Sequence, residues 1–119
     1  MKINTSISKR HRYYYLRELV QYRTAFKQGD LIHAWHHLER AHIIGQSYPY
    51  EHTYAHWLML KFGIAIKDAK EVLGQIPRLF VGGVKSFVGQ IPLGNTGGAN
   101  VPPLRSMPLP EDIQVLFRR

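Results

Sequence analysis

The sequence predicts an all-α protein made of helical hairpins, either tetratricopeptide-like or a small bundle, with an irregular Gly/Pro-rich C-terminal segment. Apolar residues recur every three or four positions through successive segments, as the buried face of a helix requires. Glycines follow where these apolar stripes end, which is typical of helix ends. A chain of 119 residues with 45% hydrophobic content is the size of one domain with a real core.

Three helices are expected in the first half of the chain. They cover about residues 10–28, 31–44 and 51–62, and Gly29, Gly45 and Gly63 are expected to end them in turn. The side chains expected to face inward are Tyr15, Leu16, Leu19, Tyr22 and Phe26 in the first helix, Leu31, Ala34, Trp35, Leu38 and Ala41 in the second, and Ala55, Leu58, Met59 and Phe62 in the third.

The spacing of two glycines raises the tetratricopeptide interpretation. Gly29 and Gly63 are 34 residues apart, which is the period of that helical hairpin. The agreement is partial, because the small residues Ala34 and Ala41 align with Asp68 and Gln75 in the second unit. A four-helix or simple hairpin domain is therefore the competing interpretation.

A fourth helix is expected at about residues 68–91, with an apolar stripe on one side and polar residues such as Gln75 and Arg78 off that stripe. It either packs on the preceding helices or lies on an anionic membrane surface, since its charges disfavour a membrane span. We expect residues 1–93 to form the helical domain. Residues 94–119 should be a loop-rich tail packed on that domain, with a short terminal helix after Pro110.

Composition limits the chemistry and the partners. The chain has no cysteine, which excludes disulfides and thiolate metal sites. Its 16 Lys and Arg against 8 Asp and Glu give a net charge of +8, which favours an acidic protein partner or an anionic membrane surface. Specific nucleic-acid binding is disfavoured, because no recognition motif accompanies the charge. The first residues lack the apolar region of a secretory signal, so a cytoplasmic location is expected.

Histidines cluster in the second and third expected helices, most of them within "HAWHHLERAHIIGQ" and "EHTYAHW". On a helical wheel His42 falls beside Leu38 at the core, with Glu39 next to it. His52 and His56 are four residues apart and share one face of the next helix. A hairpin would bring these four polar residues together.

The four residues Glu39, His42, His52 and His56 are therefore candidate metal ligands. Three imidazoles and one carboxylate suit a divalent transition metal such as Zn, Ni, Co, Cu or non-haem Fe. The competing interpretation is structural: His42 and His52 would satisfy helix-end carbonyls or pair with glutamates. The sequence leaves both interpretations open.

The other histidines of the second helix point elsewhere. His33 and His37 fall on the side opposite Leu38, with His36 and Arg40 nearby, and are expected to face solvent. They could bind metal only adventitiously. Nucleophilic catalysis is poorly supported, because cysteine is absent and no serine or threonine lies in an elbow-like motif.

Five segments in order resemble a small bacterial family named domain of unknown function 3703: "HAWHHLERAHIIGQ", "HTYAHWLMLKFG", "EVLGQIPRL", "PLGNTGGANV" and "MPLPEDI". The resemblance covers about residues 25–116. It implies a compact, mainly helical cytoplasmic protein, and its members resemble companions of heavy-metal resistance systems in gene setting. The matching polar positions in this chain are His37, Glu39, Arg40, His42, His52, Asn95 and Thr96.

Two functions from different classes follow from these observations. The first is a small metal-binding protein in metal handling or sensing, with Glu39, His42, His52 and His56 as ligands. The second is a non-catalytic interaction module whose helical hairpin and basic surface dock a protein partner or an anionic membrane. An enzyme, such as a metal-dependent hydrolase or oxidase, is disfavoured relative to both.

Overall fold

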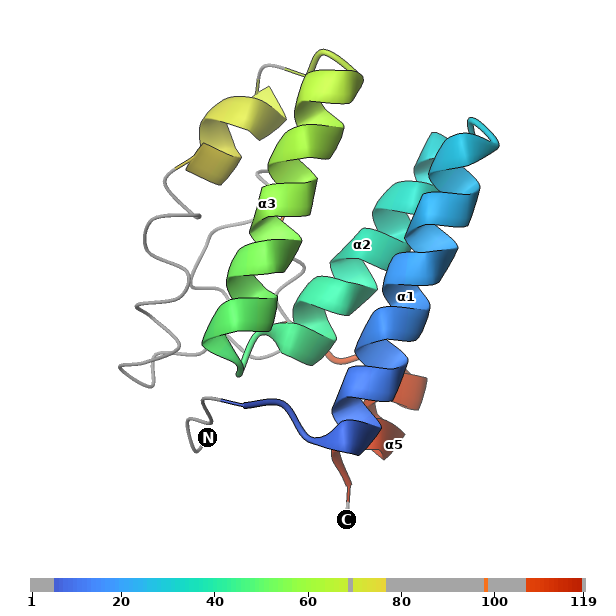
Figure 1. Cartoon of the computed structure of the whole chain (residues 1–119), viewed down its shortest axis with the longest axis vertical. Helices are drawn as coiled ribbons and strands as arrows, with labels where there is room; N and C mark the ends of the chain where they lie inside the picture. Colours follow the sequence, from blue (N-terminus) through green and yellow to red (C-terminus); the bar gives the residue numbers. More distant parts are fainter. Residues whose placement is uncertain (1–5, 69, 77–97, 99–106, 119) are drawn as a thin grey trace.

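The structure is a computed structural model that describes residues 6–68, 70–76, 98 and 107–118 (Figure 1). Its helices are α1 (Lys9–Lys27), α2 (Leu31–Gly45), α3 (Pro49–Ala65) and α5 (Glu111–Phe117), and residues 70–76 are also helical. In this part of the chain no residue lies in a strand. The predicted all-α class is confirmed.

Side-chain caps and one glycine define the first hairpin. Ser8 accepts a hydrogen bond from the His11 backbone N–H at the start of α1, and Asp30 accepts one from the His33 backbone N–H at the start of α2. Gly29 lies between the two helices with φ +76°, a left-handed conformation that glycine adopts without steric cost. The short connection makes α1 and α2 antiparallel neighbours.

The third helix is longer than the sequence predicts. It begins at Pro49, whose fixed φ and missing N–H suit the first turn, and it continues to Ala65. The expectation that Gly63 ends this helix is wrong. Gly63 lies inside α3, where a Cβ would approach the Val72 side chain within 3.2 Å. The glycine thus permits close packing of residues 70–76 against α3, as Figure 1 shows.

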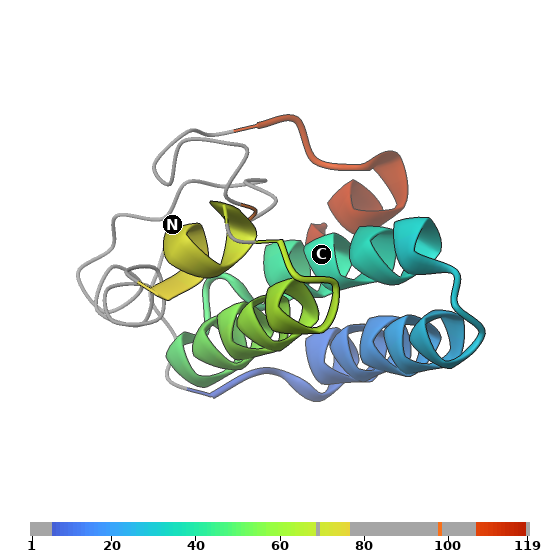
Figure 2. The same ribbon diagram turned by 90° about the horizontal axis from the view of Figure 1, so that it is seen from above.

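The core lies where α1, α2 and α3 meet, and α5 closes one side of it (Figure 2). Phe62 of α3 is a centre of the aromatic packing, since its ring contacts Tyr22 and Phe26 of α1 and Trp35 of α2. The core consists of Tyr15, Leu19, Tyr22, Ala25, Ala34, Leu38, Ala41, Ile43, Ile44, Leu58, Met59, Phe62, Ile113 and Leu116.

Most of the expected inward positions are buried or partly buried, but two are exposed. Leu16 is 45% exposed and Leu31 is 40% exposed, so both expectations are wrong. Leu16 lies at the edge of the α1 stripe, next to the buried Tyr15, and Leu31 is the first residue of α2. At the margin of a stripe and at a helix end, a wheel position does not ensure burial.

The later part of the chain is described at residues 70–76, 98 and 107–118. Residues 70–76 are helical, as predicted, and the remainder of the expected helix at 77–91, with its proposed kink at Pro77, lies outside the described residues. The short terminal helix is confirmed as α5, which Pro110 precedes and Glu111 and Asp112 begin. The tetratricopeptide likeness stays a prediction.

Gly45 at the end of α2 should be intolerant of a side chain. A Cβ at this position would lie 2.9 Å from both the Glu51 Cβ and a Tyr15 ring carbon. Gly45→Ala should therefore lower the free energy of unfolding by about 1–3 kcal/mol, the usual cost of overpacking a core. Urea unfolding followed by circular dichroism measures this change.

Gly29→Asn is the matched control for this glycine. Nothing lies within 4 Å of a Cβ at Gly29, and asparagine tolerates its left-handed conformation. The control should change stability by less than about 0.5 kcal/mol. Equal unfolding midpoints for Gly45→Ala and the wild type would show that the α2–α3 junction is not tightly packed.

Candidate metal centre

Three histidines meet at the closed end of the α2–α3 hairpin, next to the connecting residues 46–48. His42 comes from the last turn of α2, and His52 and His56 come from successive turns of α3. Their exposed fractions are 2%, 5% and 3%, so all three imidazoles are withdrawn from water. Among the described residues, these three form a group whose potential ligand atoms lie within 4.8 Å of one another.

The three Nε2 atoms form an equilateral triangle. The His42–His56, His42–His52 and His52–His56 distances between Nε2 atoms are each 3.1 Å. A zinc ion bonds imidazole nitrogen at about 2.0–2.1 Å, and three nitrogens with this spacing would then subtend angles of about 100° at the ion. These angles are close to tetrahedral and leave a fourth position on one side of the triangle.

The tight α2–α3 junction brings these imidazoles together. Gly45 packs against Glu51 and Tyr15, and the connecting residues Gln46, Ser47 and Tyr48 are all buried. The Tyr15 hydroxyl donates a 2.9 Å hydrogen bond to the Glu51 carbonyl oxygen, which ties α1 to the first turn of α3. Burial raises the pKa of the Tyr15 phenol, so this group stays a neutral donor.

A histidine outside the cluster also supports the junction. His11 of α1 makes a hydrogen bond of 2.7 Å between its Nδ1 and the Tyr48 hydroxyl, and one of 3.3 Å between its Nε2 and the Leu116 carbonyl oxygen. Because the carbonyl only accepts, Nε2 carries the proton and Nδ1 accepts from Tyr48. Burial lowers the pKa of His11, which favours this neutral form.

Gln75, which was expected on the polar side of its helix, contacts the candidate centre. Gln75 is 0% exposed, and its Oε1 lies 2.7 Å from the His56 Nδ1. Its amide nitrogen donates to Glu71 Oε2 on the preceding turn. The expected outward position of Gln75 is therefore wrong, because helix 70–76 packs with this residue towards α3. The spacing of Glu71 and Gln75 is a common helical pattern and did not identify them.

The structure brings together three of the four predicted ligands. Glu39 lies on α2 one turn before His42 and is partly buried, but its carboxylate is outside the group formed by the three imidazoles. Its role as a ligand stays a prediction. The exposed position of His33 is confirmed, and its ring lies 2.7 Å from the Asp30 carboxylate.

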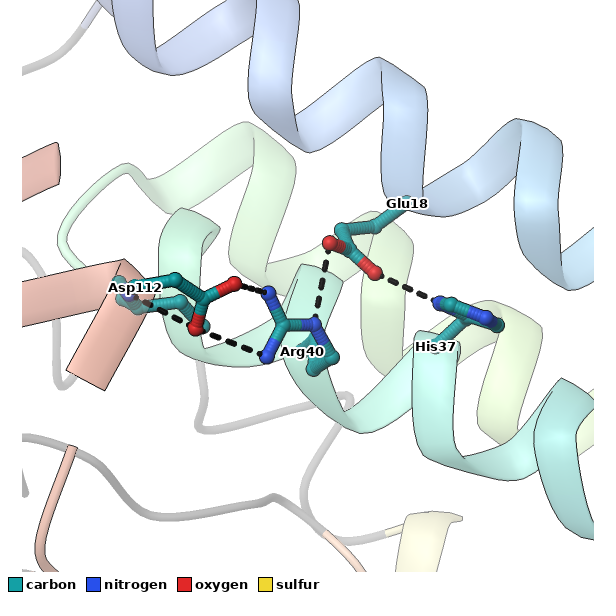
Figure 3. A network of polar contacts seen from close by, with 5 residues as sticks. Glu18, His37, Arg40 and Asp112 are labelled. Carbon is teal, nitrogen blue, oxygen red and sulfur yellow. Dashed lines mark hydrogen bonds and ion pairs between the residues drawn. The ribbon is translucent and has the colours of Figure 1, made fainter. Parts of the chain in front are cut away.

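The opposite side of α2, which was expected to face solvent, carries an ion-pair network (Figure 3). Glu18 of α1 accepts a hydrogen bond of 2.8 Å from His37 Nδ1 and one of 3.0 Å from Arg40 Nε. Arg40 also donates to both carboxylate oxygens of Asp112 on α5. The solvent-facing assignment of His37 and Arg40 is therefore wrong, because both side chains connect α2 to its neighbours.

His37 belongs to this network and not to the candidate metal centre. Its Nδ1 is bound to Glu18, and it lines a cavity of about 580 Å³ between α1, α2 and α5. His36 lines the same cavity, and its burial and the nearby Arg40 charge lower the pKa of its imidazole. The histidine-rich segment thus divides into a buried metal candidate and a structural network.

One protein-family model matches nearly the whole chain. The family described as "Protein of unknown function (DUF3703)" matches residues 9–117. The chain belongs to this family. Searches of curated proteins and of solved structures returned no match. The predicted family resemblance is confirmed, and the DUF3703 match spans α1, α2, α3 and α5, which carry the histidine triad and the ion-pair network.

Hydropathy adds one observation about this DUF3703 chain. Among the helices that the structure describes, none has both the length and the apolar character that crossing a membrane requires.

The Asp112–Arg40 ion pair predicts part of the acid sensitivity of the fold. The hydrogen bond from Arg40 holds the pKa of the Asp112 carboxyl below its usual value. A lowered pKa in the folded state adds stability above about pH 4, and this contribution is lost as the pH falls through the lowered value. Asp112→Asn should lower stability at pH 7 by less than about 1 kcal/mol, because the aspartate is largely exposed.

Urea unfolding at pH 7 and pH 3 measures this contribution. The difference in stability between the two pH values should be smaller in Asp112→Asn than in the wild type. Glu111→Gln is the matched control, since Glu111 is exposed on the same turn of α5 and makes no ion pair among the described residues. The same pH dependence in Asp112→Asn and the wild type would contradict a stabilising pair.

Proposed function

We propose that the protein binds one divalent transition-metal ion through His42, His52 and His56, and that it acts in metal handling or sensing. The observation that carries this proposal is the triangle of buried Nε2 atoms, each 3.1 Å from the other two. Imidazole nitrogens are among the commonest ligands of such ions. Three of them at this spacing supply one face of a tetrahedral or octahedral coordination sphere.

Hydrogen bonding alone accounts poorly for this triangle. Gln75 Oε1 accepts from His56 Nδ1, so the neutral His56 ring has a lone pair on its Nε2. The two remaining neutral rings can place at most two protons inside the triangle. Each of the three Nε2–Nε2 contacts needs one proton between its nitrogens to be a hydrogen bond. With at most two protons, at least one pair of nitrogens has either no proton between them or two protons that face each other, and that contact is unfavourable. An ion that uses all three lone pairs removes this conflict.

The spacing also favours some metals over others. A square-planar ion places two of any three ligands opposite each other, about 4 Å apart at ordinary metal–nitrogen distances. All three Nε2 separations are 3.1 Å, which suits tetrahedral Zn(II) or Co(II) better than square-planar Cu(II) or Ni(II). We therefore expect zinc to be the preferred ion among those that imidazole binds.

Charge favours Glu39 as the fourth ligand. Three neutral imidazoles leave both positive charges of a divalent ion uncompensated in a buried place, which is costly. Glu39 precedes His42 by three residues on α2, so the two side chains share one side of that helix. Movement of its carboxylate onto the ion would complete a tetrahedral site and offset half of the charge.

Zinc binding should depend on the buried histidines and not on the exposed ones. Loss of one of three imidazoles should weaken binding by more than the roughly 10–100-fold that removal of an outer-shell partner costs. His42→Ala and His56→Ala should therefore reduce zinc affinity by more than about 100-fold. Isothermal titration of the protein prepared without a histidine tag measures this effect.

His33→Ala is the control for these variants, since His33 also lies on α2 but is exposed and contacts Asp30. It should bind zinc as the wild type does. Glu39→Gln should weaken binding by about 10–100-fold, and unchanged affinity would place the fourth ligand elsewhere. If His33→Ala abolishes binding while His42→Ala retains it, the ion is bound on the surface and the proposed centre is wrong.

Zinc should stabilise the fold at neutral pH and not in acid. An ion that binds only the folded state adds about 2.7 kcal/mol at a free concentration 100 times its dissociation constant. Protons compete for the same imidazole nitrogens, so the increase in melting temperature should disappear near pH 5. A thermal shift that is equal at pH 7 and pH 5 would indicate carboxylate ligands instead of histidines.

Exposed apolar side chains favour one alternative function. Tyr13, Leu16 and Val20 are 61%, 45% and 55% exposed and follow one another along α1, which also carries Arg12 and Arg17. A basic and apolar helix face of this kind suits a protein partner or an anionic membrane. This interaction module becomes the preferred function if the protein does not bind a transition metal.

A further inference from the structure

Helix 70–76 reaches the metal centre through one residue. Gln75 is the buried residue of this helix, while Leu73 and Ile76 are 70% and 42% exposed. Its Oε1 lies 2.7 Å from the Nδ1 of His56, on the side of the ring opposite the Nε2 triangle. Its Nε2 is 3.5 Å from the Met59 sulfur. The helix thus contacts the His56 imidazole at Nδ1, the ring nitrogen that lies outside the triangle.

Glu71 fixes which way the Gln75 amide points. An ionised carboxylate only accepts hydrogen bonds, so the group that faces Glu71 Oε2 is the amide NH₂. The carbonyl oxygen of Gln75 therefore faces His56 and accepts the proton on its Nδ1. This tautomer leaves the lone pair of His56 Nε2 directed at the other two imidazoles.

We propose that Gln75, oriented by Glu71, is a positioning residue of the metal centre, and that helix 70–76 binds α3 more tightly when the ion is present. The proposal rests on the proposed function of His42, His52 and His56. It goes beyond that function in one respect: binding of the metal would change how tightly helix 70–76 is held against α3. Such a response suits metal sensing better than passive storage.

The coupling follows from the chemistry of imidazole. Coordination of Nε2 to a divalent ion withdraws electron density from the ring, which makes the Nδ1 proton a stronger hydrogen-bond donor. The bond to Gln75 then strengthens, and the negative charge of Glu71 lies in the same chain of contacts. By thermodynamic reciprocity, a bond that holds the helix more tightly in the metal form also makes the metal bind more tightly.

The helix is well placed to respond. Most of the stability of a helix within a protein comes from its tertiary contacts. The contacts of helix 70–76 with α3 include the packing of Val72 over Gly63 and the polar contacts of Gln75. A stronger hydrogen bond between His56 and Gln75 therefore strengthens one of the contacts that hold this helix against α3.

Zinc affinity provides the first test. Gln75→Leu should bind zinc about 10–100-fold more weakly than the wild type, because the His56 Nδ1 loses its acceptor. The double variant Glu71→Gln/Gln75→Glu exchanges the two groups and still offers an acceptor to His56, so its affinity should return to within a few-fold of the wild type. Leu73→Ala, an exposed change on the same helix, should have no effect.

Hydrogen exchange at saturating zinc provides the second test, since it does not depend on affinity. Zinc should slow exchange of the amides at residues 70–76 in the wild type and in the exchanged double variant. In Gln75→Leu, zinc should leave their exchange unchanged. Glu71→Gln, which leaves the buried Gln75 in place, should have a zinc affinity between those of the wild type and Gln75→Leu. It replaces Gln75→Leu in both tests if circular dichroism shows that Gln75→Leu is unfolded.

The outcomes distinguish this proposal from the metal site itself. If the wild type does not bind zinc, the proposed function fails. If the wild type binds zinc and Gln75→Leu, or Glu71→Gln in its place, matches it in affinity and in protection of residues 70–76, the positioning role is wrong while the metal site stands. If Gln75→Leu loses zinc affinity and the exchanged double variant does not restore it, Gln75 contributes through its packing and does not act by fixing the tautomer of His56.

Discussion

The close contact between the end of α2 and the start of α3 determines where the polar groups of the candidate centre lie. Gly45 allows this contact, since a side chain there would collide with both Glu51 and Tyr15. His42 precedes this glycine by less than one helical turn, and His52 follows Glu51 directly. Because α2 and α3 are still close together at these residues, the imidazoles of His42, His52 and His56 lie near one another. A wider separation of the two helices at the junction would move these imidazoles apart.

Helix α1 supports this junction through two sets of contacts. Tyr15 binds the backbone of the first turn of α3, and His11 binds the Tyr48 hydroxyl in the buried connection. Farther along α1, Glu18 joins His37 and Arg40 on the other side of α2, and Arg40 extends this network to α5 (Figure 3). The orientation of α2, and with it the direction of His42, thus depends on contacts from two neighbouring helices.

The buried imidazoles have an energetic cost that a metal would offset. Burial of polar rings is unfavourable unless each polar atom has a partner, and apolar residues of similar size would serve a core of this size better. Among the described residues, no buried side-chain nitrogen or oxygen lacks a hydrogen-bond partner. The partners of the three Nε2 atoms in the triangle are nevertheless one another, so three imidazoles of the same kind are in mutual contact. A cluster that contributes little to packing is expected at a functional position.

The helical fold and the approach of His42, His52 and His56 could be predicted from the sequence for the same reason. Periodic apolar residues define the helices, and the position of His42 beside Leu38 on the wheel directs it into the hairpin contact. Local periodicity could not assign His37 and Arg40 correctly, because their partner Glu18 is on another helix. Gln75 was missed for a related reason, since its burial depends on how helix 70–76 packs over Gly63. Contacts between distant segments are not encoded in the pattern of one helix.

X-ray absorption at the zinc edge, on protein prepared without a histidine tag and loaded with one equivalent of zinc, would show directly which groups bind the ion. We expect a tetrahedral ion with three imidazole nitrogens at about 2.0 Å and one oxygen ligand. The imidazole contribution should fall to two in His42→Ala. A six-coordinate shell made mainly of oxygen, or a spectrum that His42→Ala leaves unchanged, would contradict a metal centre at the α2–α3 junction.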